Sequence, residues 1–348
     1  MKRFPVLIII LALALTSCGK KDDKPKVPAN LPASKLSILA IQQFRSSGLE
    51  AIITREFSRL YNCSITTTTY PTSHELMEAA SSDSCIADLV IGIPGSFAYG
   101  DSLDQYFLPV KDLQVNKFSR ELSYDPADPL IPYGFANLAI VYNERQIDIP
   151  PTTFGDLQDA RYISQMAICD PNVSGLGRSS LIWTRALFGE DGFRMLWLSL
   201  RKNIGKKLEA PEEGLKALES GQYAMIIGLN TYSAWLKEQD PNLDYFKSVI
   251  PGEGSFIYTE HTAIHKNSAN PKIAKAFIEY LISPGSQKTM VYKLGLFPAN
   301  STTELPLSFA RIPIYSHSTH HKLDKTAINE GIKGWLDFWN DLTNFRIN

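Results

Sequence analysis

The chain has 348 residues, of which 44% are hydrophobic, and 35 basic side chains stand against 36 acidic ones. Such a balance gives no basic field for nucleic acid, and the length is enough for two domains that each bury a core. We therefore expect a two-domain protein without a nucleic-acid partner.

The first segment is typical of export. Lys2 and Arg3 precede an apolar run over residues 6–15, and small residues lead from it to Cys18. The run is shorter than the roughly 20 residues of a membrane-spanning helix. This pattern resembles the bacterial lipoprotein signal, which implies that residues 1–17 are removed and that Cys18 is the lipidation site. We expect an exported protein with a lipid anchor at the cell envelope, on the periplasmic face of a membrane or at the cell surface.

Residues 18–34 predict a flexible tether. This stretch mixes lysines and aspartates with prolines at 25, 28 and 32, so it cannot bury a core. The folded body then begins near Lys35.

The first half of the body alternates strands and helices. Residues 36–41, 63–70 and 87–93 predict strands, and residues 49–60 and a segment from Ser73 predict helices. This alternation favours a parallel sheet with helices on both faces, and such sheets bind ligands beyond the carboxyl ends of their strands. The candidate ligand-binding residues at those ends are Gln42, Gln43, Phe44, Thr72, Ser73, Pro94 and Ser96.

A second α/β unit follows. Residues 162–170 and 224–229 predict strands, a helix after Gly175 ends at Gly189, and residues 191–203 and 212–221 predict further helices. Two extended segments, residues 131–143 and 248–267, join the two units. A chain that crosses twice in this way predicts a hinge with a cleft between lobes. The apolar stripe over residues 328–345 is explained by core packing.

Residues 270–300 carry an Asn-Pro helix start, Ala and Phe at helical spacing, Ser-Pro, Gln, and then Gly and Pro. This segment resembles the carboxy-terminal part of the type II solute-binding proteins of ABC importers. The resemblance implies two lobes, each a mixed and mainly parallel sheet flanked by helices, joined by two crossover strands. Residues 35–132 with 257–348 would form lobe 1, and residues 133–256 would form lobe 2. It also implies a monomer that delivers a small ligand to a membrane permease driven by an ATPase.

Within that family, residues 131–143, 170–189 and 334–342 are most similar to the thiamine-binding group, which implies thiamine or a thiamine phosphate as the ligand. The sequence departs from the group where aromatic and acidic contacts are expected, at Ile41, Thr72, Pro211, Leu229 and Gly295. A polyamine, an organophosphate or ferric iron therefore remain alternative ligands, and binding of envelope or host components remains an alternative function.

The segment DPNVSGLGRSS, which starts at Asp170, has two interpretations. Ser174 and Gly175 stand at the amino end of a helix, where unpaired N–H groups favour a phosphate. Alternatively, Ser174 only caps the helix, while Gly175 and Gly177 ease packing. The expected position at a cleft favours the anion site.

A cationic ring would be held by aromatic faces. The candidates are Phe44, Tyr133, Tyr232, Trp235, Phe256 and Tyr258, with Asn230 as a hydrogen-bonding residue. For Trp235 and the alternating pair Phe256 and Tyr258, core packing competes with ligand contact.

No metal, cofactor or catalytic site is expected. His317, His320 and His321 are the best metal candidates, but their surroundings favour a polar surface loop. The ferric-binding relatives generally use adjacent tyrosines, which this sequence lacks. Local catalytic motifs such as G-x-S-x-G and H-E-x-x-H are absent, so we expect no enzyme. Three cysteines follow Cys18, and a pair between Cys63 and Cys85 is left open.

Overall fold

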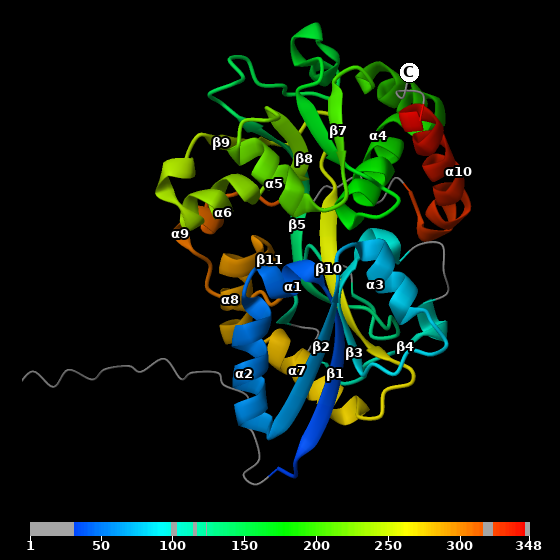
Figure 1. The fold of residues 1–348 in the computed structure, drawn as a ribbon, viewed down its shortest axis with the longest axis vertical. Helices are drawn as coiled ribbons and strands as arrows, with labels where there is room; N and C mark the ends of the chain where they lie inside the picture. The colour runs from blue at the N-terminus through cyan, green and yellow to red at the C-terminus, as the bar shows by residue number, and fades with distance from the viewer. Residues whose placement is uncertain (1–30, 99–102, 114–116, 123, 316–322, 345–348) are drawn as a thin grey trace, which may run out of the picture.

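The computed structural model describes residues 31–98, 103–113, 117–122, 124–315 and 323–344, which form two α/β lobes stacked along the long axis (Figure 1). Parallel strands form the centre of each lobe, and helices lie beside them. The predicted two-lobed α/β architecture is therefore confirmed.

The first lobe contains three parallel strands in the order β2, β1, β3. These are β1 (Ser34–Ile41), β2 (Cys63–Tyr70) and β3 (Leu89–Pro94), connected by α1 (Gln42–Ser46), α2 (Leu49–Tyr61) and α3 (Ser73–Ala80). Helix α2 buries Leu49, Ile53 and Phe57, whose four-residue spacing gives it one apolar face. Every residue of β3 is buried, as expected for a strand covered on both sides. The carboxyl ends of all three strands consequently meet at the edge that faces the second lobe.

Two long antiparallel strands connect the lobes: β5 (Ile131–Asn143) and β10 (Ile257–His265) (Figure 1). Strand β10 also pairs with β3, and β5 also pairs with β8 of the second lobe, so one continuous sheet passes through both lobes. Short elements border these crossings: η1 (Gly95–Phe97), η2 (Leu103–Gln105), β4 (Phe107–Leu108) and β9 (Phe246–Val249).

In the second lobe β6 (Met166–Cys169) lies between β7 (Ile204–Leu208) and β8 (Met225–Leu229), parallel to both. Its helices are α4 (Gly175–Leu200), α5 (Pro211–Glu219) and α6 (Tyr232–Gln239), and the 3₁₀ turn η6 (Pro241–Leu243) follows. Gly189 interrupts α4 with φ 70°, where the sequence predicts a helix end. Strand β7 was not predicted, because two lysines stand in the middle of its apolar pattern.

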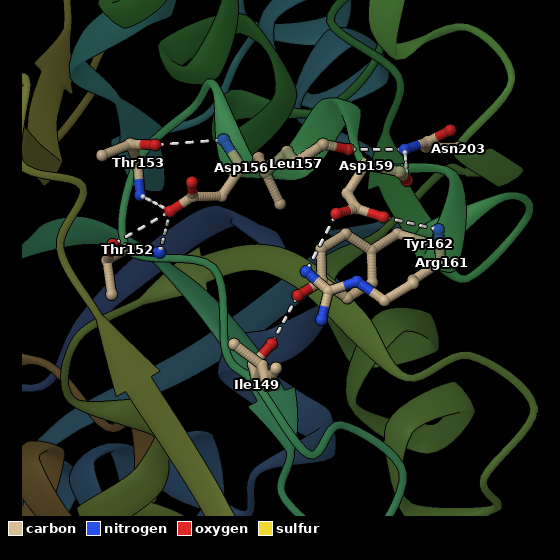
Figure 2. Close-up of polar contacts among 9 residues, drawn as sticks. All are labelled: Ile149, Thr152, Thr153, Asp156, Leu157, Asp159, Arg161, Tyr162 and Asn203. Atoms are coloured by element: carbon tan, nitrogen blue, oxygen red, sulfur yellow. Dashed lines mark hydrogen bonds and ion pairs between the residues drawn. The ribbon is translucent and has the colours of Figure 1, made fainter.

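The segment before β6 is held by side-chain caps, and the expected strand over residues 162–170 is therefore shorter (Figure 2). In η4 (Asp156–Gln158), the carboxylate of Asp156 accepts the N–H of Thr153, while Thr153 Oγ1 accepts the N–H of Asp156. In η5 (Ala160–Tyr162), Asp159 accepts the N–H of Arg161. Asn203 donates to the carbonyl oxygens of Leu157 and Asp159. Such reciprocal caps satisfy the free N–H groups of a short turn.

The last helices divide between the lobes. Helices α7 (Pro271–Leu281) and α8 (Pro284–Leu294) pack against α2, followed by β11 (Phe297–Pro298) and α9 (Leu307–Ala310). The sequence places all of residues 257–348 in lobe 1, but α10 (Lys325–Asn344) packs on α4 in the second lobe. Trp339 explains the difference, because it packs edge-on against Trp197 and donates Nε1–H to Asp170.

Several expectations fall outside the described residues: the signal over residues 1–17, Cys18, most of the tether, and His317, His320 and His321. Among the residues that the structure does describe, no helix combines the length and apolarity that a membrane crossing needs. Cys63, Cys85 and Cys169 are buried free thiols there, so the pairing left open for Cys63 and Cys85 is not formed.

Candidate functional site

A cleft with a free volume of about 260 Å³ lies between the lobes, at the carboxyl ends of the parallel strands. The first lobe contributes Ile41, Gln42, Gln43, Ser46, Pro71, Thr72, Ser73, Gly92 and Pro94. The second lobe contributes Ser174, Gly175, Leu176, residues 209–213 and Lys216, and strand β10 contributes Tyr258 and Glu260. Two other hollows border β1 and β2, but each is lined by the first lobe alone.

The charged side chains that line the cleft are mostly acidic. Among the described residues, the carboxylates of Glu209, Glu212, Glu213 and Glu260 line the cleft beside one cationic side chain, that of Lys216. Glu212 and Glu213 belong to the first turn of α5, where the partial positive charge of a helix end favours carboxylates. Burial raises the pKa of Glu212, and the neighbouring Lys216 opposes that rise. The cleft therefore favours a positively charged ligand.

Glu260 is the most buried of these carboxylates, with 6% of its surface exposed. Tyr133 from β5 donates its hydroxyl to Oε2, and Tyr258 donates to Oε1 at 2.9 Å. Burial raises the pKa of Glu260, while the two tyrosine hydroxyls act in the opposite direction. Burial and the charge of Glu260 together hold the pKa of the Tyr133 hydroxyl well above its usual value.

The amino end of α4 contacts the first lobe directly. The N–H of Gly175 donates to Ser73 Oγ at 3.2 Å, and Ser96 Oγ donates to the carbonyl oxygen of Gly175 at 2.9 Å. The Arg178 guanidinium lies 3.5 Å from the centre of the Phe97 ring. The lobes thus meet in a closed arrangement along this side of the cleft.

Ser174 is placed as expected, but its hydroxyl does not cap the helix. Its side chain lines the cleft and is 2% exposed, its Oγ makes no well-aligned hydrogen bond among the described residues, and the buried Cys169 thiol is its polar neighbour. A buried hydroxyl without a partner costs roughly 1–3 kcal/mol. A ligand atom in the cleft could satisfy it.

The structure divides the fifteen predicted ligand-binding residues into two groups. Eight of them line the cleft: Gln42, Gln43, Thr72, Ser73, Pro94, Ser174, Gly175 and Tyr258. The other seven lie behind or away from its surface: Phe44, Ser96, Tyr133, Asn230, Tyr232, Trp235 and Phe256.

Each of the seven has a structural contact that explains its place. Phe44, Tyr232 and Phe256 are buried in the main hydrophobic core. Asn230 accepts the N–H of Asn137 and donates to the carbonyl of Pro313, and Trp235 donates Nε1–H to the carbonyl of Tyr292. Ser96 and Tyr133 touch Gly175 and Glu260, which themselves line the cleft.

The resemblance to thiamine binders placed a contact position at Pro211, but sequence reasoning missed the charged residues around it, Glu209, Glu212, Glu213 and Lys216, and also Glu260. The segment around Pro211 had a signal, because a proline followed by Glu212 and Glu213 is typical of the first turn of a helix. Because strand β7 was not predicted, however, the start of this helix was not expected to lie at the carboxyl end of a strand. Glu260 had no local signal, because it lies within an alternating strand pattern.

The comparisons with known proteins agree with this geometry. Residues 86–312 match the family of bacterial extracellular solute-binding proteins. The chain belongs to this family. It is 23% identical over 228 residues to the thiamine-binding periplasmic protein of Brucella suis biovar 1 (strain 1330), a match that covers 65% of this chain and 67% of the relative. The predicted resemblance to solute-binding proteins, and to thiamine binders among them, is confirmed.

Several solved binding proteins share the fold. A periplasmic thiamin binding protein has a TM-score of 0.78 at 18% identity, covering 90% of this chain and 99% of that one. AfuA from Actinobacillus pleuropneumoniae, with fructose-6-phosphate bound, has a TM-score of 0.76 at 17% identity, covering 90% and 99%. The spermidine/putrescine-binding PotD from Streptococcus pneumoniae has 0.69 at 17%, covering 90% and 100%. The fold alone therefore accommodates cationic and anionic solutes.

Proposed function

We propose that this solute-binding protein captures a small organic cation in the interlobe cleft and passes it to the permease of an ABC importer. The carboxylates of Glu209, Glu212, Glu213 and Glu260 against Lys216 support this proposal. Thiamine is the first candidate, because it is a permanent cation and the chain resembles thiamine-binding periplasmic proteins.

The same charges favour thiamine over its phosphate esters. A phosphate adds negative charge, which the four carboxylates repel. The N–H of Gly175, expected to hold such a phosphate, already donates to Ser73. Ser174 and Gly175 then serve as neutral hydrogen-bonding and packing residues of the site.

A polyamine is the second candidate. Carboxylates lie both on α5 and on β10, so amino groups spaced along one ligand can each meet a negative charge. This arrangement favours binding of spermidine over fructose 6-phosphate and other anions, which the carboxylates of the cleft repel.

Delivery requires a closed, ligand-bound form near the membrane. The contacts of Gly175 with Ser73 and Ser96 supply bonds across the cleft that only a closed form makes. A ligand that touches both lobes shifts the equilibrium toward that form. The export signal and Cys18 support an anchor that holds the protein at the envelope.

Isothermal titration with thiamine, thiamine diphosphate, spermidine, fructose 6-phosphate and ferric citrate tests the proposal. We expect thiamine to bind at least about tenfold more tightly than its diphosphate, because like charges in the cleft cost the diphosphate affinity. Glu212→Gln should weaken thiamine binding by about tenfold or more. Glu219→Gln, an exposed change on the same helix, is the matched control. Tight binding of the diphosphate or of fructose 6-phosphate, with none of thiamine or spermidine, would refute a cation site.

A further inference from the structure

Strand β10 changes register against both of its neighbours, between Glu260 and His261 toward β5 and between His261 and Thr262 toward β3. Glu260 pairs with Gly134 and His261 with Pro132, so Tyr133 of β5 has no partner in the ladder. Toward β3, His261 pairs with Ile93 and Thr262 with Ile91, so Gly92 has no partner in that ladder. Such bulges redirect side chains, and they occur often beside functional sites. Here the unpaired Tyr133 points its hydroxyl at Glu260.

The result is a buried carboxylate that pairs with no cation among the described residues. Glu260 is 6% exposed, and within the described part of the chain its partners are the hydroxyls of Tyr133 and Tyr258. An ionised carboxylate is costly to bury unless it is paired. Each oxygen accepts one tyrosine hydroxyl and keeps lone-pair capacity for another donor. Glu260 also lines the cleft, so that donor can come from a ligand.

A second buried polar group faces the same cleft from the other lobe. Ser174 Oγ is buried and makes no well-aligned hydrogen bond among the described residues, with the Cys169 thiol beside it. It lines the cleft together with Glu260 and Tyr258. Two buried polar groups with spare capacity, one on β10 and one before α4, thus face the same space. Water or a ligand in that space would complete their hydrogen bonds.

We propose that Glu260 is the specificity-determining residue of the cleft, receiving a cationic nitrogen group of the solute, with Tyr133 and Tyr258 as the positioning residues of its carboxylate. This inference rests on the proposed capture of an organic cation and names the residue that selects it. The other glutamates of the cleft attract the ligand, whereas Glu260 pairs with it.

The proposal predicts coupling between ligand binding and a proton. Burial and the nearby Glu212 raise the pKa of Glu260, while Tyr133 and Tyr258 oppose the rise. The charge of Glu260 also contributes to the raised pKa of Tyr232 on α6. A bound cation favours the ionised carboxylate, so binding should release a proton, and affinity should fall as the pH falls toward the pKa of the free protein.

The experiment compares the wild-type protein with Glu260→Gln, which keeps the shape of the side chain and removes its charge. Isothermal titrations with thiamine and with spermidine are run in two buffers of different ionisation enthalpy, from about pH 8 to about pH 5. This range lies above the pKa of the adjacent His261, which burial lowers to about 4. Glu219→Gln is the charge-matched control, and Tyr133→Phe tests the positioning role.

We expect Glu260→Gln to lose about thirtyfold or more in affinity for the cation that the wild type binds, and to lose the proton release. Tyr133→Phe should keep the proton release, but its affinity should begin to fall at a higher pH, because the Tyr133 hydroxyl that lowers the pKa of Glu260 is lost. A purely structural role would not produce this change. Unchanged affinity and proton release in Glu260→Gln would overturn this inference and leave the proposed function intact. A wild-type protein that binds neither thiamine nor spermidine would overturn both.

Discussion

Gly175 and Gly177 stand two residues apart in the first turn of α4, yet different neighbours require them to be glycine. A Cβ at Gly175 would lie 2.2 Å from Pro94 of the first lobe, so this glycine permits the close approach of the lobes. A Cβ at Gly177 would lie 2.3 Å from the carbonyl oxygen of Cys169, so that glycine permits packing within the second lobe. Of the two interpretations of this segment, close packing explains both glycines.

A single residue, His261, makes the stability of the fold depend on pH. Its Nδ1 hydrogen-bonds the carbonyl oxygen of Ile93, and burial lowers its pKa from 6.5 to about 4. The unfolded chain therefore takes up a proton first as the pH falls, so the stability due to the neutral imidazole is complete above about pH 6.5 and is lost toward about pH 4.

The free energy of unfolding of the wild type should be lower at pH 4.5 than at pH 7. In His261→Gln we expect this difference to be smaller by roughly 1–3 kcal/mol. Urea denaturation of both proteins at the two pH values measures this difference. An equal loss in the variant would show that other groups cause the acid sensitivity.

At the scale of elements, α10 supports the turn that carries the cleft residues. Trp339 and Asn340 bond to Asp170 and Asn172, which lie between β6 and α4. Asp170 also pairs with Lys207 of β7 at 2.9 Å, and its backbone oxygen accepts the N–H of Ser174. Residues outside the matched family segment therefore help to position the amino end of α4.

Trp339→Ala should destabilise the protein by about 3–5 kcal/mol, because a fully buried indole and its bond to Asp170 are lost together. Thermal and urea unfolding measure the change. Lys333→Ala, an exposed change on the same helix, should be nearly neutral. Similar stabilities of the two variants would mean that α10 contributes little to the second lobe.

At the scale of the whole molecule, two crossing strands and the contacts around Gly175 define a closed state. The crossings β5 and β10 remain paired in one sheet, and outside them the lobes bond to each other at Gly175 and through Trp235 of α6 and Tyr292 of α8. The bonds to Gly175 and the stacking of Arg178 on Phe97 are each worth about 0.5–2 kcal/mol. Opening therefore breaks several contacts of modest strength, which a ligand bound to both lobes reinforces.

Gly175→Ala should disfavour closure by about 1–3 kcal/mol, because the new methyl group collides with the rigid ring of Pro94. We expect weaker thiamine binding and a larger radius of gyration by small-angle X-ray scattering, with nearly unchanged unfolding of the lobes. Gly285→Ala is the control, since nothing lies within 4 Å of its added Cβ. Wild-type affinity and compactness in Gly175→Ala would contradict a closed state built on this contact.

The sequence predicted elements well where the pattern is strong and local. The strands over residues 63–70 and 131–143 have the predicted bounds, since β-branched and apolar runs favour extended chain whatever surrounds them. Strand β7 escaped prediction because Lys206 and Lys207 break its apolar pattern. Of the predicted contacts, most polar and small residues at strand ends line the cleft, except Ser96 and Asn230, whereas most aromatic residues were taken up by the core.

The sequence by itself determined the order of strands and helices, the two crossings and hence the two-lobed fold, because periodicity and helix boundaries depend on neighbouring residues. Only the tertiary structure decided that Glu260 meets Tyr133, that α10 packs on the second lobe, and that the cleft is acidic. The contact of Glu260 with Tyr133 depends on the register between strands more than a hundred residues apart, where a shift of one residue would turn the side chains of a strand to the opposite face.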